Sequence, residues 1–394
     1  MNALAEHVPH RVTVGIVAGE ASGDALGADL IRAVRQRLPE IRFAGIGGPR
    51  MEAAGCELWY PQAALAVRGY AEVITHLPGL LRIRRELHQR LRAANAPLFI
   101  GVDAPDFNLG LEARLKRQNV RTIHYVSPSV WAWRHKRIGR MALSADHLLV
   151  LFPFEPPLYR DTGIRISFVG HPLAASAATA ASRREARELL KFEMGVPVFA
   201  LLPGSRMSEL EMHSELLLKA AAALVESQPQ ARFVVPLVSR DAREYFEHVQ
   251  YRLQLETLSL KLLYGHAADA LRAADVGIVA SGTATLDAAM ARCPHLVFYR
   301  VHAITAQIVK RRLLLPYVGL PNILAGRFVA PEFLQREATV ENLARAARNL
   351  YDDVVTRRRT EALFASLADA LKADGATIAA EAVLTELRTA GVRC

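Results

Sequence analysis

The sequence contains little cysteine, with only Cys56, Cys293 and Cys394 among 394 residues. These three residues lie far apart and form no C-x-x-C pair, so the sequence indicates neither a disulfide framework nor a zinc site. Such sparse cysteine is compatible with a reducing compartment.

Long apolar runs are also missing. No stretch of about 18 uncharged apolar residues occurs, so we expect no transmembrane helix. The N-terminal segment MNALAEHVPHRV lacks the basic start, the apolar core and the small-residue cleavage site of a signal peptide. We therefore expect a cytoplasmic protein, or one that rests on a membrane without crossing it.

Acidic residues are in the minority. The chain has 49 Lys and Arg against 39 Asp and Glu, which gives a formal net charge of +10. A basic surface favours anionic partners, among them nucleic acid, anionic lipid head groups and phosphorylated substrates. Hydrophobic residues make up 51% of the chain, which is typical of a globular protein and enough for two cores.

Strand-like and helix-like segments alternate twice along the chain. In the first half the strand-like runs lie at 12–18, 42–47, 98–103, 121–127, 147–152 and 167–170. After an alanine-rich stretch that follows His171-Pro172, further runs lie at 198–202, 232–238, 260–265, 276–280 and 295–299. This alternation predicts parallel sheets with helices on both faces.

We therefore predict an α/β fold with two Rossmann-like domains, residues 1–172 and 173–360. The remaining segment, 361–394, is helical in pattern. It would pack back on the first domain or on a neighbouring chain, and the sequence leaves open whether the protein is a homodimer.

Two turns of the second domain are candidates for phosphate binding. The first is Pro203-Gly204-Ser205-Arg206, which follows a strand-like run and precedes a helical pattern. Gly204 lets the backbone approach a ligand closely, and Arg206 offers paired donors to a pyrophosphate. A tight turn with an exposed arginine would explain this stretch equally well.

The second candidate is Ser281-Gly282-Thr283, which follows the run 276–280 and leads into a helix near Thr283. Free N–H groups at a helix start favour an anion, and Asp287, one turn further on, could accept hydrogen bonds from ribose hydroxyls. Helix capping alone would account for one such turn. Two such turns in one domain, both after strands, favour nucleotide binding.

The turn VAGEASGD (17–24) is acidic, in contrast to the two turns that suit a phosphate. Its acids Glu20 and Asp24 would repel a pyrophosphate, and it lacks the G-x-G-x-x-G spacing of dinucleotide-binding turns. We expect Glu20, Ser22 and Asp24 to face hydroxyl groups on an acceptor sugar. An alternative is that Asp24 only caps the following helix.

A further candidate is Asp103, which directly follows the run at 98–102. Asp106 or Asn108 is placed to cap the next helix, which leaves Asp103 without an evident structural duty. A carboxylate at the end of a strand is a reasonable general base for a sugar hydroxyl, and Asp106 would lie on the same acceptor side. A turn-forming aspartate before Ala-Pro is the competing interpretation.

Two basic amphipathic segments are candidates for lipid contact. One spans 65–92 and the other 309–326, where three cations precede an apolar run. For either segment, a core-facing helix with a solvated basic face is the alternative. Trp131 and Trp133, which stand among basic residues, could suggest nucleic acid or could line a cleft.

Seven stretches, in this order, resemble the lipid A disaccharide synthases. They are VAGEASGDALGADLIRA, GGPRMEAAGCELWY, VDAPDFNL, IHYVSPSVWAWR, LLPGSR, SGTATLD and LPNILAG. One departure is Asp287, where the family usually has glutamate in SGTA-x-x-E.

The resemblance implies a GT-B glycosyltransferase, with two Rossmann-like domains facing across a cleft and a hinge near residue 172. Members of this family join UDP-2,3-diacylglucosamine to 2,3-diacylglucosamine 1-phosphate (lipid X) and release UDP. The product is a β-1,6-linked disaccharide 1-phosphate, formed with inversion and without a metal or other cofactor. The resemblance also implies peripheral association with the inner face of the inner membrane of a Gram-negative bacterium.

For individual residues, the resemblance implies that Asp103 is the base and that Arg206 binds the donor diphosphate. It adds Asn322, in the LPN motif, to the UDP-sugar contacts. Two other functions compete with this one. A UDP-N-acetylglucosamine 2-epimerase would share the fold but act on a soluble substrate. A nucleic-acid-binding protein would explain the basic charge, but we see no nucleic-acid motif and expect no such partner.

Overall fold

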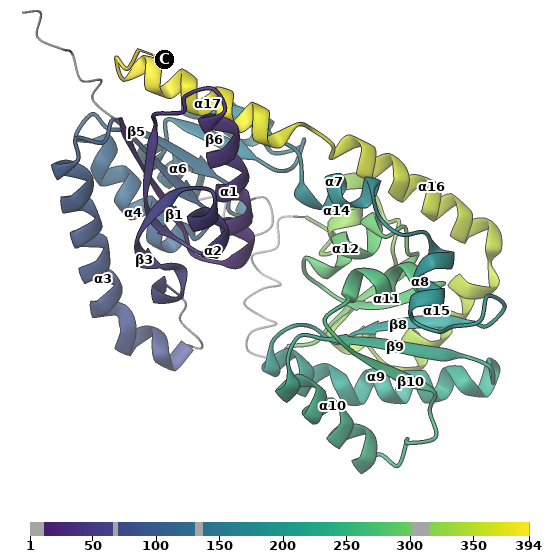
Figure 1. Ribbon diagram of the computed structural model, residues 1–394. Helices are drawn as coiled ribbons and strands as arrows, with labels where there is room; N and C mark the ends of the chain where they lie inside the picture. Colours follow the sequence, from purple (N-terminus) through teal and green to yellow (C-terminus); the bar gives the residue numbers. More distant parts are fainter. Residues whose placement is uncertain (1–11, 66–69, 131–136, 302–314, 394) are drawn as a thin grey trace, which may run out of the picture. The chain divides into compact units, whose positions relative to one another are not determined.

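The computed structural model describes residues 12–65, 70–130, 137–301 and 315–393. The chain forms two compact units, which are described separately here (Figure 1). Unit 1 comprises Met1–His171 and Ala373–Cys394, and unit 2 comprises Pro172–Lys372. The chain therefore passes from one unit to the other twice. The expected C-terminal segment 361–394 is divided, because its first twelve residues, 361–372, belong to unit 2.

Unit 1 is built on a seven-stranded parallel sheet with the order β3-β2-β1-β4-β5-β6-β7. The strands are β1 (Thr13–Ala18), β2 (Arg42–Gly47), β3 (Cys56–Pro61), β4 (Leu98–Val102), β5 (Arg121–Tyr125), β6 (His147–Val150) and β7 (Arg165–Phe168). Every residue of β1 and β4 is buried, which explains their continuous apolar sequence, since both faces of this sheet are covered.

Helices cover both faces of the unit 1 sheet (Figure 1). Helices α1 (Ala21–Arg35) and α17 (Gly375–Thr389) pack together and share one hydrophobic cluster with β1, β4 and β5. On the other face lie α3 (Tyr70–Ala93), α4 (Pro105–Lys116) and α6 (Arg137–Ser144). The short helix α2 (Pro49–Ala53) packs against α1.

Unit 2 has a six-stranded parallel sheet with the order β10-β9-β8-β11-β12-β13. Its strands are β8 (Val198–Leu202), β9 (Arg232–Leu237), β10 (Leu260–Tyr264), β11 (Val276–Ala280), β12 (His295–Tyr299) and β13 (Glu332–Leu334). The sequence did not predict β13 or, in unit 1, β3. Both are edge strands with partly exposed residues, so neither has the apolar run of a central strand.

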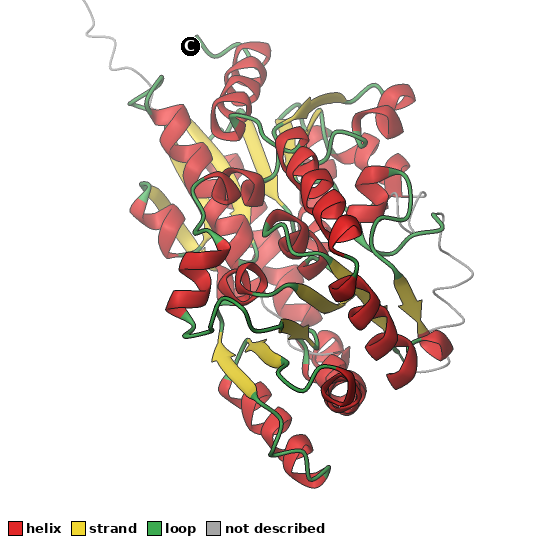
Figure 2. Ribbon diagram, turned by 90° about the vertical axis from the view of Figure 1, so that its right-hand side faces the viewer, coloured by secondary structure: helices red, strands yellow, loops and turns green. Residues whose placement is uncertain are grey.

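The helices of unit 2 also form two layers (Figure 2). One layer contains α9 (Met207–Ser227), α10 (Arg240–Arg252) and α15 (Val340–Asp352). The other contains α7 (Pro172–Ala178), α8 (Arg183–Leu189), α11 (Ala267–Ala273), α12 (Ala284–Met290), α14 (Leu320–Ala325) and α16 (Val354–Ala370). Each unit is thus a complete three-layer α/β structure with its own core.

Candidate active site

The strand order reverses beside the first strand of each sheet. In unit 1, β1 pairs with β4, and in unit 2, β8 pairs with β11. Ligands of open parallel sheets bind beyond the carboxyl ends of the strands at such a reversal. The VAGEASGD turn and Asp103 follow β1 and β4, and the PGSR and SGT turns follow β8 and β11. All four motifs therefore lie where the fold favours a ligand.

Asp103 sits in a strained turn at the end of β4. Both Asp103 and Ala104 have left-handed backbone, with φ of 49° and 44°, which is uncommon outside glycine. The backbone N–H of Asp103 donates to the Tyr125 carbonyl at 2.7 Å, and Asn108 Nδ2 donates to the Asp103 carbonyl at 2.8 Å. Strained residues held by several contacts are common at functional sites.

The carboxyl group of Asp103 is partly buried, and this changes its acidity. Desolvation raises its pKa above the ordinary value of 3.8, while the nearby His124 and the backbone N–H of Ala104 act in the opposite direction. A carboxylate with a raised pKa is a stronger base, which suits the role expected for Asp103.

The structure gives Asp24 a different role from the expected sugar contact. Its side chain is buried and accepts hydrogen bonds from the backbone N–H groups of Gly48, Arg50 and Met51, at 2.8 to 3.0 Å. These groups open helix α2, so Asp24 caps that helix from a distance and not its own helix α1. With three partners in the core, Asp24 links α1 to α2 and is a structural residue.

The other acceptor-side residues are exposed. Glu20 and Ser22 are accessible to solvent at the start of α1, and Glu20 makes no side-chain capping bond there. Asp106 is also exposed and pairs with Arg137 at 2.9 Å. Neither Asp106 nor Asn108 is the cap of α4, because the capping position is Ala104. Glu20, Ser22 and Asp106 are therefore open to a ligand, and Asp24 is not.

In the PGSR turn, Gly204 has a φ of 116°, which favours glycine. The two N–H groups that follow it are taken: Glu209 Oε2 accepts from Ser205 at 3.0 Å and from Arg206 at 3.2 Å. Glu209 was not predicted from the sequence, although an acid three residues after the helix cap is a capping signal. The Arg206 side chain is 77% exposed and lies 3.7 Å from Glu209. Ser205 and the Arg206 guanidinium are the exposed parts of the turn.

The SGT turn leads into α12, which begins at Ala284. Gly282 and Thr283 are exposed, and Thr283 makes no side-chain capping bond. Asp287, one turn inside the helix, makes no side-chain hydrogen bond or ion pair within the described ranges. Burial raises its pKa to about 6. A partly buried carboxylate without a partner is available to a ligand hydroxyl.

Asn322 differs from the expected UDP-sugar contact. It is fully buried; its Oδ1 accepts from the N–H groups of Val329 and Ala330, and its Nδ2 donates to Ala330 and Glu332. All four hydrogen-bonding positions of the amide are occupied within the protein. Asn322 therefore holds the segment before β13 in place and has no free atom for a substrate. Glu332, which the sequence did not mark, also accepts from Val318 and Gly319.

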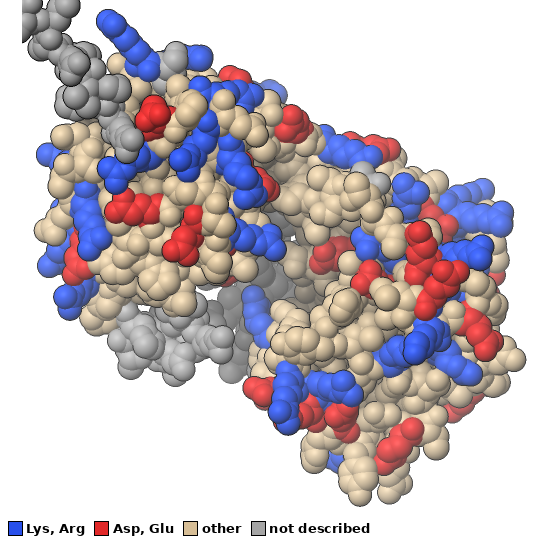
Figure 3. Space-filling view, in the orientation of Figure 1, with Lys and Arg blue, Asp and Glu red and all other residues tan. Residues whose placement is uncertain are grey.

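The two basic segments are described only in part. Trp131, Trp133 and residues 66–69 and 302–314 lie outside the described residues. In the described part of α3, Arg82 is exposed and pairs with Glu86, while Arg90 stacks over the rings of Trp59 and Tyr60. On the face drawn in Figure 3, cations of each unit stand among acids and do not form one continuous patch.

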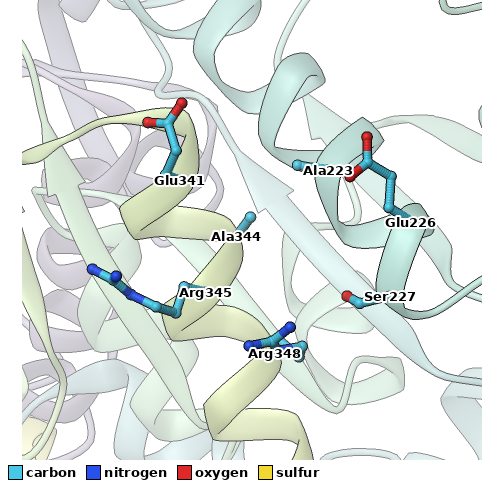
Figure 4. A pocket seen from close by; sticks show the side chains of 7 residues that line it. All are labelled: Ala223, Glu226, Ser227, Glu341, Ala344, Arg345 and Arg348. Atoms are coloured by element: carbon cyan, nitrogen blue, oxygen red, sulfur yellow. The ribbon is translucent and has the colours of Figure 1, made fainter.

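A shallow pocket lies elsewhere on unit 2, between α9 and α15 (Figure 4). It is lined by Ala223, Glu226, Ser227, Glu341, Ala344, Arg345 and Arg348. These α9 residues belong to the end of the helix remote from the PGSR turn, so the pocket is not part of the candidate site.

No described helix has the length and hydropathy to cross a membrane. Among the described residues, no three His, Cys, Asp or Glu side chains gather as metal ligands would.

Comparisons with solved structures bear on the fold. The calicheamicin glycosyltransferase CalG4 has a TM-score of 0.60 and 15% identity, covering 96% of this chain and 98% of that chain. The UDP-GlcNAc 2-epimerase from Neisseria meningitidis, bound to UDP-GlcNAc, has a TM-score of 0.57 and 11% identity, covering 96% of this chain and 100% of that chain. At such identities the likeness concerns the fold alone, and this fold is GT-B.

Sequence comparisons are far more specific. Residues 14–383 match the family described as lipid-A-disaccharide synthetase. The lipid-A-disaccharide synthase of Chromobacterium violaceum is 51% identical over 95% of this chain and 97% of its own length. That of Methylobacillus flagellatus is 46% identical over 95% and 100%. The chain therefore belongs to the lipid-A-disaccharide synthase family of GT-B glycosyltransferases.

Proposed function

We propose that this enzyme transfers the glucosaminyl group of UDP-2,3-diacylglucosamine to the 6-hydroxyl of lipid X, with Asp103 as the base. The observation that carries the assignment of roles is the position of the four motifs at the two sheet reversals. Unit 1 offers a partly buried carboxylate, and unit 2 offers an exposed guanidinium and a helix start. Unit 1 is thus suited to activating an alcohol, and unit 2 is suited to binding an anion.

In unit 1, Asp103 would accept the proton of the acceptor hydroxyl as its oxygen bonds to C1 of the donor sugar. The raised pKa of Asp103 favours this transfer, because the carboxylate is a stronger base than a solvated one. Glu20, Ser22 and Asp106, which are exposed, would orient the acceptor by hydrogen bonds to its polar groups. Attack on the face opposite the leaving group inverts the anomeric centre.

In unit 2, Arg206 would stabilise the charge that grows on the diphosphate as the bond between C1 and the UDP oxygen breaks. Glu209 occupies the N–H groups of Ser205 and Arg206, so the exposed guanidinium carries this role. Ser281, Gly282 and Thr283 would contact the phosphates, and Asp287 the ribose, while Gly204 permits close approach. The Asp287 side chain is one methylene shorter than the glutamate usual in the family.

We also propose that the enzyme works at the inner face of the inner membrane, since both substrates carry acyl chains. The net charge of +10 and the exposed Leu81 and Arg82 of α3 support this proposal. Vesicles with anionic lipid should sediment the protein at low salt, and vesicles of neutral lipid alone should not. Equal binding to both would remove the electrostatic part of the proposal.

The product assay tests the function directly. Purified protein is incubated with UDP-2,3-diacylglucosamine and lipid X, and the products are analysed by mass spectrometry. We expect a disaccharide 1-phosphate and one UDP for each bond formed. In a parallel reaction, unacylated UDP-N-acetylglucosamine should be neither transferred nor epimerised. Epimerisation without disaccharide formation would favour the epimerase hypothesis instead.

A further inference from the structure

A buried acid and imidazole lie next to Asp103. Glu112 of α4 and His124 of β5 are both fully buried, and the distance from His124 Nδ1 to Glu112 Oε1 is 2.7 Å. In the sheet register His124 is opposite Gly101, two residues before Asp103. Paired residues of neighbouring strands point to the same face of a sheet, so Gly101 and His124 share one face, close to the turn that contains Asp103.

Gly101 leaves the space that this pair needs. A Cβ atom at position 101 would lie 2.1 Å from Glu112 Oε1 and 2.9 Å from Asn108 Cβ. The Glu112 carboxyl group therefore lies directly over the backbone of β4, close to its carboxyl end. The same helix carries Asn108, which donates to the Asp103 carbonyl.

Three atoms of this cluster have no hydrogen-bond partner in the described part of the chain. They are Asn108 Oδ1, Glu112 Oε2 and His124 Nε2, and all are buried. Buried polar atoms without partners are rare in native proteins because their desolvation is not compensated. Three in one cluster beside the candidate base indicate that the cluster is retained for a purpose other than stability.

Several of the other charged groups on the elements around α4 and β5 have partners away from Asp103. Arg84 contacts the Phe107 carbonyl, His88 bonds Gln118, Arg137 pairs with Asp106, Lys116 and Arg121 pair with Asp146, and His147 bonds Glu386. On β6, the residue opposite His124 is the apolar Leu148. Desolvation raises the pKa of Asp103 and is the larger effect, and His124 is the side chain that opposes this rise.

We propose that Glu112 and His124 are positioning residues for the reaction: Glu112 holds the His124 ring beside Asp103, where the ring favours the ionised form of the carboxyl group that acts as the base. This inference rests on the proposed role of Asp103 as the base. In this arrangement His124 offsets part of the cost of ionising a partly buried carboxyl group, and the hydrogen bond with Glu112 offsets the cost of burying the imidazole ring.

The pH dependence of kcat/KM tests the proposal, because its acidic limb reports the base of the free enzyme. Glu112→Gln weakens the contact that holds the His124 ring, and His124→Asn removes the ring beside Asp103. The acidic limb should then move to higher pH by about one unit, which lowers kcat/KM about tenfold on that limb. The rate at the alkaline plateau should change much less.

His147→Asn is the matched control. It removes another buried imidazole from the same sheet, one that bonds Glu386 at 3.2 Å and lies on β6. A general loss of stability would affect all three variants alike, whereas only loss of the Glu112–His124 pair should move the limb. A limb that stays in place in both test variants, or moves equally in His147→Asn, would overturn the proposal.

A measurement on the unaltered protein covers the case in which the variants do not fold. The ¹⁵N shift of His124 Nδ1 should be that of a nitrogen that carries a proton and donates to the Glu112 carboxylate, and an Nδ1 without a proton would overturn the proposal. Asp103→Asn separates the two hypotheses. Retained turnover in that variant would reject the proposed role of Asp103. If Asp103→Asn is inactive but the acidic limb is unmoved in Glu112→Gln and His124→Asn, only the role of the pair is rejected.

Discussion

The carboxylate of Glu386 accepts a hydrogen bond from Arg121 Nε at 2.8 Å, although 265 residues separate the two along the chain. Glu386 belongs to α17, Arg121 begins β5, and the glutamate is fully buried. Its other neighbours are His147 at 3.2 Å and Arg165 at 3.3 Å. Burial alone would raise the pKa of Glu386, but the bonds from His147 and Arg121 bring it below its ordinary value. This carboxylate fixes the C-terminal helix to unit 1.

Glu386→Gln should destabilise unit 1 by about 3–5 kcal/mol, because it removes one partner of a buried charge network. Urea unfolding followed by circular dichroism measures this loss. Glu381→Gln on the same helix is the control: Glu381 is 55% exposed and lies 3.4 Å from Arg37, so we expect about 0.5 kcal/mol or less. Since the folded pKa of Glu386 is lowered, its contribution is present above pH 4.5 and is lost as the pH falls through the folded pKa. Equal effects of the two substitutions would contradict this account.

Asp103→Asn should reduce turnover by at least about a thousandfold, since the amide cannot accept the proton of the acceptor hydroxyl. UDP should still bind, because the residues proposed to hold it belong to unit 2. Turnover is measured by product formation and UDP binding by calorimetry. Asp29→Asn, at an exposed position on α1 paired with Arg32, serves as the control and should keep normal activity. Turnover within a few fold of the unaltered enzyme would remove Asp103 from the mechanism.

Arg206→Ala should weaken UDP binding about 10- to 100-fold, because a charge-assisted contact to the diphosphate is lost. Calorimetric titration with UDP measures the change, and uridine alone should bind both proteins equally. Arg240→Ala removes a similarly exposed cation from unit 2, one that pairs with Glu244 at 2.7 Å, and should leave UDP affinity unchanged. If Arg206→Ala and Arg240→Ala behaved alike, the diphosphate would have to be held elsewhere.

Asp287→Asn should stabilise the free protein at pH 7, because burial raises the pKa of Asp287 from 3.8 to about 6. The folded protein binds this proton more tightly than the unfolded chain, so the stability contributed by Asp287 falls as the pH rises from 3.8 to 6. At pH 7 the carboxylate is ionised at a cost of about 1–3 kcal/mol, which the amide avoids. Thermal unfolding at pH 7 and pH 4 checks this, and the gain should disappear at pH 4.

The same substitution tests the ribose contact. Asp287→Asn should weaken UDP binding if the carboxylate accepts hydrogen bonds from ribose hydroxyls, since an amide is a weaker acceptor. Stabilisation without any loss of UDP affinity would mean that Asp287 does not touch the nucleotide.

Most central strands could be located from the sequence. The predicted runs 198–202, 276–280 and 295–299 coincide with β8, β11 and β12. A strand buried on both faces must be apolar along its whole length, and that requirement is visible without any knowledge of its neighbours. The edge strands β3 and β13 were missed because most of their residues are partly exposed and form no apolar run, so pairing with a neighbouring strand defines them.

The sequence by itself determined the two parallel-sheet units, the family and the loops that follow the strands, because local apolar patterns and turn residues encode them. Only the tertiary structure decided what each polar side chain does. Asp24 caps α2, Asn322 is saturated inside its loop, and Glu209 occupies the N–H groups of the PGSR turn. In each case the hydrogen-bond partners are chosen by burial and proximity in three dimensions. Asp24 finds its partners 24 to 27 residues away, and no local pattern specifies such a pairing.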